Sequence, residues 1–417
     1  MDGDKLEWDS IRLKWLLKKE LDGYDEDSLD TLEDFFDKWV EPIMAKKKAG
    51  ILKTVIPIED NSLISSMCKL LDAIAVPKNK IDYEKRFEDE IFWIKYEKWF
   101  IFAMIWTIGA ALDTNCRKEF DIIVRDIEDA FPFSQTVYDC YINVEKSEYV
   151  KWEDRLTTLP VNWAPNDLNT PDHKFLVETV DTLRSRQLID IALRSNTKLL
   201  LIGGTGTGKT SIVNSLLQDL DESFTYNIIN LSANTTSEKL QEIVQSKLKK
   251  PGKKVYRPPG GKSSVIFIDD LNMPKQDEYG SQPPIELIRQ YAEYGGWYDR
   301  SALDVFVEVK NCELLCAMGP PGGGRNQITE RLTSKFQILN LPMPDALQIK
   351  RVFSCILFFK MSKFDQDEIK ANIEKSVDVI IDLFKGIQNS EQFKPTPLKS
   401  HYLFNMRDMM RVVQGMA

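Results

Sequence analysis

The stretch KLLLIGGTGTGKT, Lys198 to Thr210, decides the fold class. Its first five residues are mainly apolar and predict a short buried strand. Its last eight residues fit the pattern G-x-x-x-x-G-K-[ST], and the residues that follow predict a helix over about 209–220. Because a strand precedes the glycines and a helix follows them, the stretch predicts a P-loop rather than a flexible Gly/Thr turn.

The chemistry of a P-loop gives each residue type a separate task. Glycines allow successive backbone N–H groups to face the phosphates without a clash from Cβ. Lys209 places a positive charge against the β and γ oxygens, and the Thr210 hydroxyl can ligate Mg²⁺. The positive end of the following helix also faces the anion. We therefore predict ATP with Mg²⁺ as the cofactor, bound by Gly203, Gly204, Thr205, Gly206, Thr207, Gly208, Lys209 and Thr210.

A second motif lies downstream of the P-loop. Residues 265–270 read VIFIDD, an apolar run that ends in two carboxylates. Taken alone, such a run is typical of any buried strand with a polar end. After a P-loop it predicts the Walker B strand, in which Asp269 holds the Mg²⁺ shell and Asp270 occupies the catalytic position.

The residues expected to drive hydrolysis depart from the usual pattern. ATPases of this architecture usually carry Glu where this chain has Asp270, and the loss of one methylene withdraws the carboxylate. A misplacement of about 1 Å can cost about a hundredfold in rate. The next strand ends at Met318, and Gly319 stands where a polar side chain would sense the γ-phosphate. We predict tight nucleotide binding with slow or negligible turnover, and the sequence leaves open whether the segment is an enzyme.

Apolar periodicity divides the chain into three regions. Residues 1–165 predict helix after helix, including one over Ser62–Ala75 and a buried one over Trp99–Leu112 that is too short to span a membrane. The composition changes between Val150 and Pro171, where Trp152, Trp163, Asn166 and Asn169 predict an ordered connection anchored by aromatic residues. No strand alternation of any length is visible before this connection.

The second region alternates short apolar strands with helices. The strands are expected over 198–202, 224–231, 264–268 and 313–318, a helix over 237–249, and a basic Gly/Pro-rich loop over 251–262. Continuous apolar strands separated by helices indicate a parallel sheet covered on both faces. From about Asp345 the pattern is helical again. The fold class is therefore α/β, a P-loop module whose parallel sheet is flanked by helices.

Charge and cysteine usage narrow the class further. The net charge of -9 argues against general affinity for nucleic acid or anionic membranes. The chain has 6 cysteines without a C-x-x-C pair and only 2 histidines, which makes a structural zinc site improbable. Met1–Asp30 is too charged to be a secretory signal. We expect buried, reduced thiols in a soluble protein inside the cell.

Three stretches resemble the third AAA+ module of an axonemal dynein heavy chain. They are IDDLNMPKQDEYGSQPPIELIRQYAEYGGWYDR (Ile268 to Arg300), CAMGPPGGGRN (Cys316 to Asn326) and HYLFNMRDMMRVVQG (His401 to Gly415). The helical region resembles the C-terminal part of the second module. The resemblance implies an all-helical lid and connection over 1–165, an AAA+ large subdomain over 166–345, and part of a small helical subdomain over 346–417.

The resemblance also implies roles for two arginines. Arg331, in TERLTSKF, matches the arginine that such modules present to the neighbouring module's nucleotide, here that of the second module. Arg407 matches the sensor arginine that reaches the γ-phosphate of its own site. Asp270, Arg331 and Arg407 are thus the expected catalytic positions. Gly204 replaces a proline common in the family, which removes no phosphate-contacting group.

The function implied is a regulatory, weakly hydrolysing ATP-binding segment of a motor ring that serves microtubule-based ciliary motility. Its partners would be the other AAA+ modules and dynein complex subunits, with microtubules reached only indirectly, in the cytoplasm, cytoskeleton and ciliary axoneme. No first module, linker, stalk or microtubule-binding tip is visible, so we expect a fragment or a truncated or divergent product. Two alternatives stay open: a structural ring fragment that does not exchange nucleotide, and an autonomous AAA+ ATPase.

Overall fold

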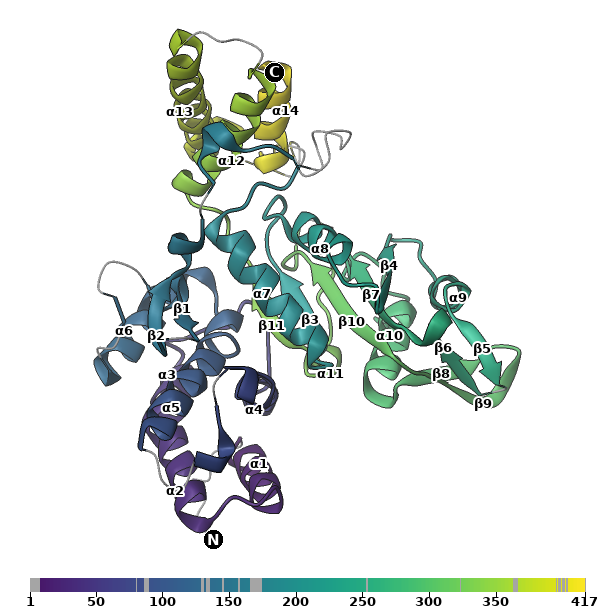
Figure 1. Ribbon diagram of the computed structural model, residues 1–417. Coiled ribbons are helices and arrows are strands. Elements are labelled where there is room, and N and C mark those ends of the chain that lie inside the picture. The colour runs from purple at the N-terminus through teal and green to yellow at the C-terminus, as the bar shows by residue number, and fades with distance from the viewer. Residues whose placement is uncertain are drawn as a thin grey trace. The chain divides into compact units, whose positions relative to one another are not determined.

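Two compact units, each assembled from distant segments of the sequence, make up the chain (Figure 1). Unit 1 comprises Met1–Lys151, Gln187–Ile202 and Asp219–Asn340, and unit 2 comprises Trp152–Arg186, Gly203–Gln218 and Leu341–Ala417. This computed structural model describes residues 8–79, 81–85, 90–128, 131–132, 136–144, 146–156, 158–165, 175–252, 254–322, 324–362, 367–394, 396, 399, 402 and 404–416.

The first part of unit 1 is a set of helices packed through aromatic side chains. The helices are α1 (Asp9–Leu21), α2 (Glu26–Phe35), α3 (Glu41–Lys48), α4 (Asp60–Ile74), α5 (Glu90–Ile105) and α6 (Arg117–Ile127). A single π-helical turn after α2 directs Phe36 and Trp39 inward, where Phe36 packs edge-on against Phe100 at 5.1 Å. The predicted helices over 62–75 and 99–112 are confirmed as α4 and the end of α5 with the turns that follow it.

A hairpin at the end of this part was not predicted. The strands β1 (Cys140–Asn143) and β2 (Glu148–Lys151) pair antiparallel. Their four residues each are too few for a clear alternation, and Ser147 in the connecting turn adopts a positive φ of 53°. The expectation of helices alone before the connection was therefore wrong at this place.

The second part of unit 1 is a parallel sheet with the strand order β11-β3-β10-β7-β4 (Figure 1). The strands are β3 (Leu199–Ile202), β4 (Phe224–Asn230), β7 (Ser263–Asp269), β10 (Cys312–Met318) and β11 (Gln337–Asn340). All four pairings are parallel, and β3 is buried along its whole length. Along the chain these strands alternate with the helices α7 (Val180–Arg194), α9 (Ser237–Ser246), α10 (Pro283–Tyr294) and α11 (Glu330–Thr333). The predicted α/β class is confirmed.

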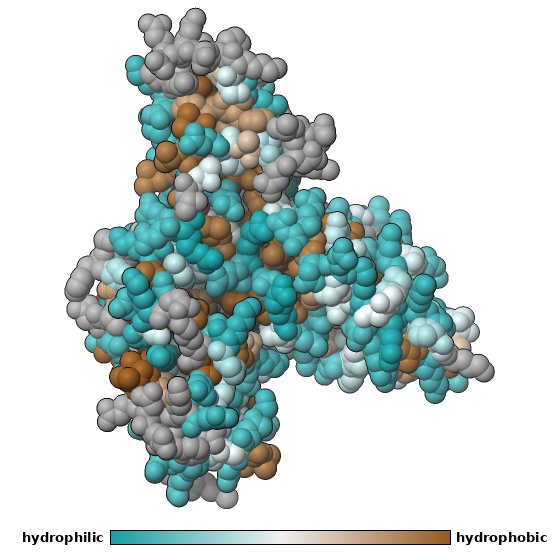
Figure 2. All heavy atoms as spheres, viewed as in Figure 1, coloured by the Kyte–Doolittle hydropathy of each residue, from teal (hydrophilic) through white to brown (hydrophobic). Residues whose placement is uncertain are grey.

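A second sheet projects from this core, with the order β5-β6-β9-β8. Its strands are β5 (Lys249–Gly252), β6 (Val255–Arg257), β8 (Gly296–Asp299) and β9 (Ala302–Val309). The loop predicted over 251–262 is therefore wrong in part, because a short hairpin crosses it. Hydrophilic residues predominate on the surface that Figure 2 shows over this region.

Within unit 1 the helical part and the central sheet share buried hydrogen bonds at β11. Gln337 donates through Nε2 to the carbonyl of Trp106 at 3.1 Å, and Asn340 donates through Nδ2 to the carbonyl of Leu112 at 2.9 Å. Arg117, the first residue of α6, donates back to the carbonyl of Asn340 at 2.6 Å. These donors are buried, so each bond replaces one that water would otherwise make.

Unit 2 joins the connection, α8 (Lys209–Gln218) and three C-terminal helices: α12 (Ala346–Lys360), α13 (Asp367–Asn389) and α14 (Met406–Met416). Trp163 packs edge-on against Phe175 and Phe359, with ring centroids 5.7 Å and 5.9 Å apart. This confirms that an aromatic residue anchors the connection, whereas Asn166, Asn169 and Pro171 lie outside the described residues. No helix among the described residues is long and apolar enough to cross a membrane.

Candidate functional site

The carboxyl ends of three central strands meet at one edge of the sheet. Met318 of β10 pairs with Ile202 of β3, and Cys316 of β10 pairs with Ile268 of β7. Gly203 follows β3, Asp270 follows β7 and Gly319 follows β10. In open parallel sheets ligands bind outside the carboxyl ends of the strands. Each of these predicted site residues directly follows such a strand end.

Residues 203–210 form a tight loop whose carbonyls surround the Lys209 ammonium. Lys209 donates to the carbonyl of Gly203 at 2.7 Å and to that of Gly204 at 2.8 Å, and it lies 3.4 Å from Thr207 Oγ1. Thr207 itself donates to the Gly204 carbonyl at 3.1 Å. Thr205 lies in the turn, and Thr210 lies in the first turn of α8. The loop therefore concentrates positive charge at the N-terminus of a helix, a setting that favours a phosphate.

Two of the loop glycines have no room for a side chain. A Cβ on Gly203 would lie 2.6 Å from the Leu341 carbonyl oxygen. A Cβ on Gly206, whose φ is +90°, would lie 3.0 Å from Cβ of Met406. Gly204 differs, because the nearest atom to its Cβ would be 3.8 Å away. The turn geometry thus requires glycine at 203 and 206 and permits another residue at 204.

The same contact brings the start of α14 against the loop. Met406 is the first residue of α14 and Arg407 is the second. The Arg407 backbone N–H donates to Asn405 Oδ1 at 2.8 Å, and its side chain is exposed. Within unit 2 the helix that carries the predicted sensor arginine therefore begins beside the phosphate loop.

Asp269 and Asp270 have different surroundings at the end of β7. Asp269 is buried, and its Oδ1 accepts a hydrogen bond from the backbone N–H of Asp270 at 2.9 Å. Asp270 adopts a left-handed backbone with a φ of 52°, which aspartate tolerates better than most residues. Its side chain is 48% exposed. The buried carboxylate fits a metal ligand, and the exposed one can meet substrate or water.

Arg325 occupies the space beside Gly319 and faces Asp270. Its Nη2 lies 3.7 Å from Asp270 Oδ1. A Cβ on Gly319 would lie 2.7 Å from the Cζ, Nε and Nη1 atoms of Arg325, so any larger residue at 319 would displace the guanidinium. A two-way backbone bridge between Gly322 and Arg325 folds the chain back to this position. Gly319 has no side chain that could contact a γ-phosphate, and the space that a side chain would occupy is filled by the Arg325 guanidinium.

Buried amides hold the loops after β7 and β10 together. Asn272 is fully buried and donates through Nδ2 to the Gly319 carbonyl at 2.8 Å. The Asn326 backbone N–H donates to the Asn272 carbonyl at 3.0 Å, and Asn326 Nδ2 donates to the Pro274 carbonyl at 2.7 Å. Sequence reasoning missed Asn272, Arg325 and Asn326 as framework residues. The glycine run followed by Arg325 and Asn326 was the available signal, since it predicts a tight turn that ends in a cation.

Arg331 lies in the short helix α11 of unit 1 and is exposed. Among the described residues its side chain has no hydrogen-bond or ion-pair partner.

The cysteines show no sign of a metal site. In the described ranges no group of three or more His, Cys, Asp or Glu residues could hold a metal ion, and all six cysteines are free thiols. Burial raises the pKa of Cys140 and Cys355 to about 11 and that of Cys312 to about 12. Burial also raises the pKa of the Cys68 and Cys316 thiols. The expectation of reduced thiols is consistent with these surroundings, although Cys116 and Cys312 are only partly buried.

Two protein-family models match this chain. Residues 164–344 match the model described as the P-loop containing dynein motor region. Residues 32–154 match the dynein heavy chain AAA lid domain. The matched ranges take in the central sheet with its phosphate loop and most of the helical part.

Curated relatives align along almost the whole chain. Dynein axonemal heavy chain 2 of Homo sapiens is 38% identical over 412 residues, 99% of this chain and 9% of the relative. The Dynein-1-beta heavy chain of the flagellar inner arm I1 complex of Chlamydomonas reinhardtii is 35% identical over 442 residues, 99% of this chain and 10% of the relative. Dynein axonemal heavy chain 6 of Homo sapiens is 33% identical over 426 residues. The chain therefore spans about a tenth of the length of these relatives.

Proposed function

Since the chain belongs to the axonemal dynein heavy chain family, we propose that it is a regulatory nucleotide-binding segment of such a motor. It comprises the C-terminal part of the second AAA+ module and most of the third. The observation that carries the proposal is the loop of residues 203–210, whose carbonyls hold the Lys209 ammonium at the start of α8. Membership of a P-loop motor family supports nucleotide binding.

The bound nucleotide is ATP with Mg²⁺ in this proposal. Gly203–Thr210 would contact its phosphates, and Lys209, which now donates to the loop carbonyls, would supply a positive charge to a phosphate oxygen. Thr210 and Asp269 are the metal ligands, since hydroxyl and carboxylate oxygens suit Mg²⁺. The cation supplies charge neutralisation on the phosphates. Arg407 acts on the same nucleotide, and Arg331 acts on the nucleotide of the preceding module.

Slow hydrolysis is the second half of the proposal. Asp270 is one methylene shorter than the usual glutamate, and Arg325 lies 3.7 Å from the oxygen that would orient water. Gly319 contributes no side chain to the γ-phosphate and instead accommodates the arginine. These three features support a site that holds nucleotide for long periods and biases the conformation of a ring through differential binding.

We assign residues 1–165 to the helical lid and connection of the preceding module, 166–345 to the large subdomain, and 346–417 to part of a small helical subdomain. The partners proposed are the other AAA+ modules of one dynein ring and the subunits of the dynein complex. Contact with microtubules is indirect. The proposed locations are the cytoplasm, the cytoskeleton and the ciliary axoneme.

Fluorescent ATP binding to the wild-type chain and to Lys209→Ala tests the proposal. We expect the substitution to weaken binding by at least tenfold, because a charge-assisted hydrogen bond contributes about 1.5–3 kcal/mol. Equal binding by both proteins, or binding by neither, would favour the non-exchanging structural fragment. Single-site turnover as fast as that of a competent ATPase, with a stable hexamer in size-exclusion chromatography with ATP, would favour an autonomous ATPase.

A further inference from the structure

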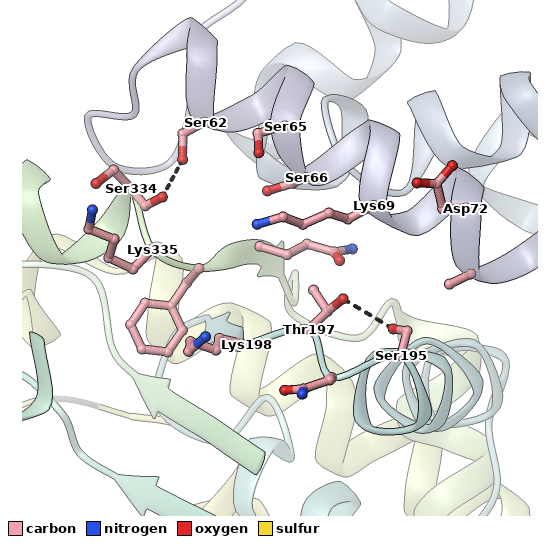
Figure 3. A pocket seen from close by; sticks show the side chains of 14 residues that line it. Ser62, Ser65, Ser66, Lys69, Asp72, Ser195, Thr197, Lys198, Ser334 and Lys335 are labelled. Atoms are coloured by element: carbon pink, nitrogen blue, oxygen red, sulfur yellow. Dashed lines mark hydrogen bonds between the residues drawn. The ribbon is translucent and has the colours of Figure 1, made fainter. Parts of the chain in front are cut away.

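Unit 1 contains a polar cavity of 560 Å³ whose lining includes no residue of the phosphate loop (Figure 3). Three segments line it: α4 of the helical part, the residues that lead into β3, and the residues that lead into β11. The cavity thus lies where the helical part meets the edge of the central sheet. Its lining is mostly hydroxyl, amide and ammonium groups.

Each of the three segments contributes one lysine. Lys69 comes from α4, Lys198 precedes β3 and Lys335 precedes β11. Figure 3 shows these side chains around one space. Lys335 has an ion-pair partner, Glu293, at 3.3 Å. The ammonium groups of Lys69 and Lys198 have no hydrogen-bond or ion-pair partner anywhere in the described ranges, and the charge of Glu313 is the one carboxylate charge that acts on Lys198.

The lysines are close enough to influence one another. Burial is the main cause that lowers the pKa of Lys198, and the positive charges of Lys69 and Lys335 lower it further. The negative charge of Glu313 acts in the opposite direction. A cluster of like charges with one partly desolvated member is unfavourable by itself. An anion between them would remove this repulsion.

Neutral donors complete the lining. Ser65 and Ser66 are half-buried on the α4 side of the cavity. Ser62 donates to the Ser334 carbonyl at 2.8 Å, and thereby ties α4 to the segment before β11. Hydroxyl and ammonium groups are among the donors that phosphoryl oxygens accept from in proteins.

One carboxylate, Asp72, also lines the cavity, and lysines that are not part of the lining neutralise its negative charge. Lys18 lies 3.1 Å and Lys19 lies 2.8 Å from its oxygens, and the Trp15 indole donates to it at 3.1 Å. These partners neutralise Asp72, so Asp72 does not cancel the positive charge that the lysines bring to the cavity.

We propose that this cavity binds a phosphoryl group, held by Lys69, Lys198 and Lys335 and by the hydroxyls of Ser65 and Ser66. A tetrahedral oxyanion suits donors that approach from three separate segments, whereas a planar carboxylate presents its oxygens in one plane. The volume accommodates a linear polyphosphate or a phosphorylated side chain that enters from solvent. Both sources share the phosphoryl chemistry.

Binding would fasten the helical part to the sheet. The anion links α4 to the segments before β3 and β11, in addition to the hydrogen bond from Ser62 to Ser334. A ligand that binds only the folded arrangement stabilises it in proportion to its concentration. The site therefore adjusts the rigidity of unit 1 independently of the nucleotide at residues 203–210.

The test is calorimetric titration of the full chain with sodium tripolyphosphate. The titration uses a Lys209→Ala background, because the phosphate loop would otherwise bind the same probe. We expect one site per chain, and about tenfold or greater weakening on Lys69→Gln, with a larger effect when Lys198→Gln is added. Lys118→Gln is the matched control, since Lys118 is an exposed lysine of the same unit outside the cavity.

A second arm identifies the source of the phosphoryl group. An Ala-Ala-phosphoserine-Ala-Ala peptide and its unphosphorylated twin are titrated into the same four proteins. Lysine-dependent binding of tripolyphosphate alone indicates a free anion, and lysine-dependent binding of the phosphopeptide indicates a modified side chain. Lys69 is exposed, so Lys69→Gln should fold, and a melting curve without ligand verifies this. Absence of binding, or binding unchanged by Lys69→Gln, overturns the proposal.

Discussion

The guanidinium of Arg325 lies 3.7 Å from the carboxylate of Asp270, on the same edge of the sheet where β7 and β10 end. The pair joins the loop that would carry the catalytic carboxylate to the loop that would carry the γ-phosphate sensor. An ion pair competes with water for the same carboxylate oxygen. The arrangement therefore couples the two departures from the usual ATPase sequence pattern, Asp270 and Gly319, through a third residue.

We predict that Arg325 and Asp270 act together in limiting hydrolysis. Asp270→Glu alone should raise single-turnover hydrolysis of ATP only slightly, because the longer carboxylate still faces the arginine. Combined with Arg325→Ala, the gain should exceed the product of the two single effects by about tenfold, within the usual range of coupling between contacting residues. Rapid-quench measurement of bound ATP provides the four rates.

Gly319→Ala should also separate the Arg325 guanidinium from Asp270. The added Cβ would lie 2.7 Å from three guanidinium atoms, and Arg325 must move away while its charge is kept. Hydrolysis by Gly319→Ala should then resemble that of Arg325→Ala. A fall in turnover on Arg325→Ala would instead identify the arginine as a catalytic cation.

Gly206→Ala should weaken nucleotide binding, whereas Gly204→Ala should not. Gly206 combines a φ of +90° with a Cβ position 3.0 Å from Met406, while Gly204 has ordinary space around it. A left-handed backbone costs a non-glycine residue about 1–2 kcal/mol, so affinity should fall about tenfold. Fluorescent ATP titration of the two variants provides the comparison, and equal affinities would contradict the role given to Gly206.

Asn340→Ala should destabilise unit 1 by about 1–3 kcal/mol, because it leaves the buried Leu112 carbonyl without its donor. Asn230→Ala at the exposed end of β4 is the control, and we expect it to change stability little. Urea unfolding followed by tryptophan fluorescence measures both. Similar midpoints for the two variants would show that the bond at β11 contributes little.

Cys116 should be the first thiol alkylated by iodoacetamide in the native protein at pH 8. Burial raises the pKa of Cys140 and Cys355 to about 11, and such thiols are ionised at about one part in a thousand at this pH. Cys116 is only partly buried. Peptide mass spectrometry after brief labelling gives the order of reaction. In urea all six should react, and equal native labelling of Cys355 and Cys116 would contradict the burial.

The parallel sheet could be predicted because β3, β7 and β10 are continuous apolar runs, and burial on both faces requires this composition. The second sheet could not. Its strand β5 is exposed along its length and contains Pro251, so its residues look like a loop until β6 pairs with them. The hairpin of β1 and β2 was missed for a similar reason, since pairing rather than composition fixes such short strands.

The candidate site could be predicted only where it depends on local motifs. Gly203–Thr210 and Asp269 follow from patterns in which each residue has a chemical task. Arg325 was not predicted, because its importance comes from a turn at Gly322 that returns the chain to Gly319. The three lysines of the cavity lie far apart in sequence, and only the packing of α4 against the sheet brings them together.

The hydrogen bonds at β11 also determine which shorter pieces of this chain should fold when they are expressed alone. β11 is one of the two edge strands of the central sheet, and its side chains donate hydrogen bonds to the carbonyls of Trp106 and Leu112. A piece expressed from residue 166 onward would present this strand uncovered, and exposed edge strands pair with other chains and aggregate. We assign residues 1–165 and 166–345 to different modules, yet these hydrogen bonds make the helical part and the central sheet of unit 1 depend on one another for folding.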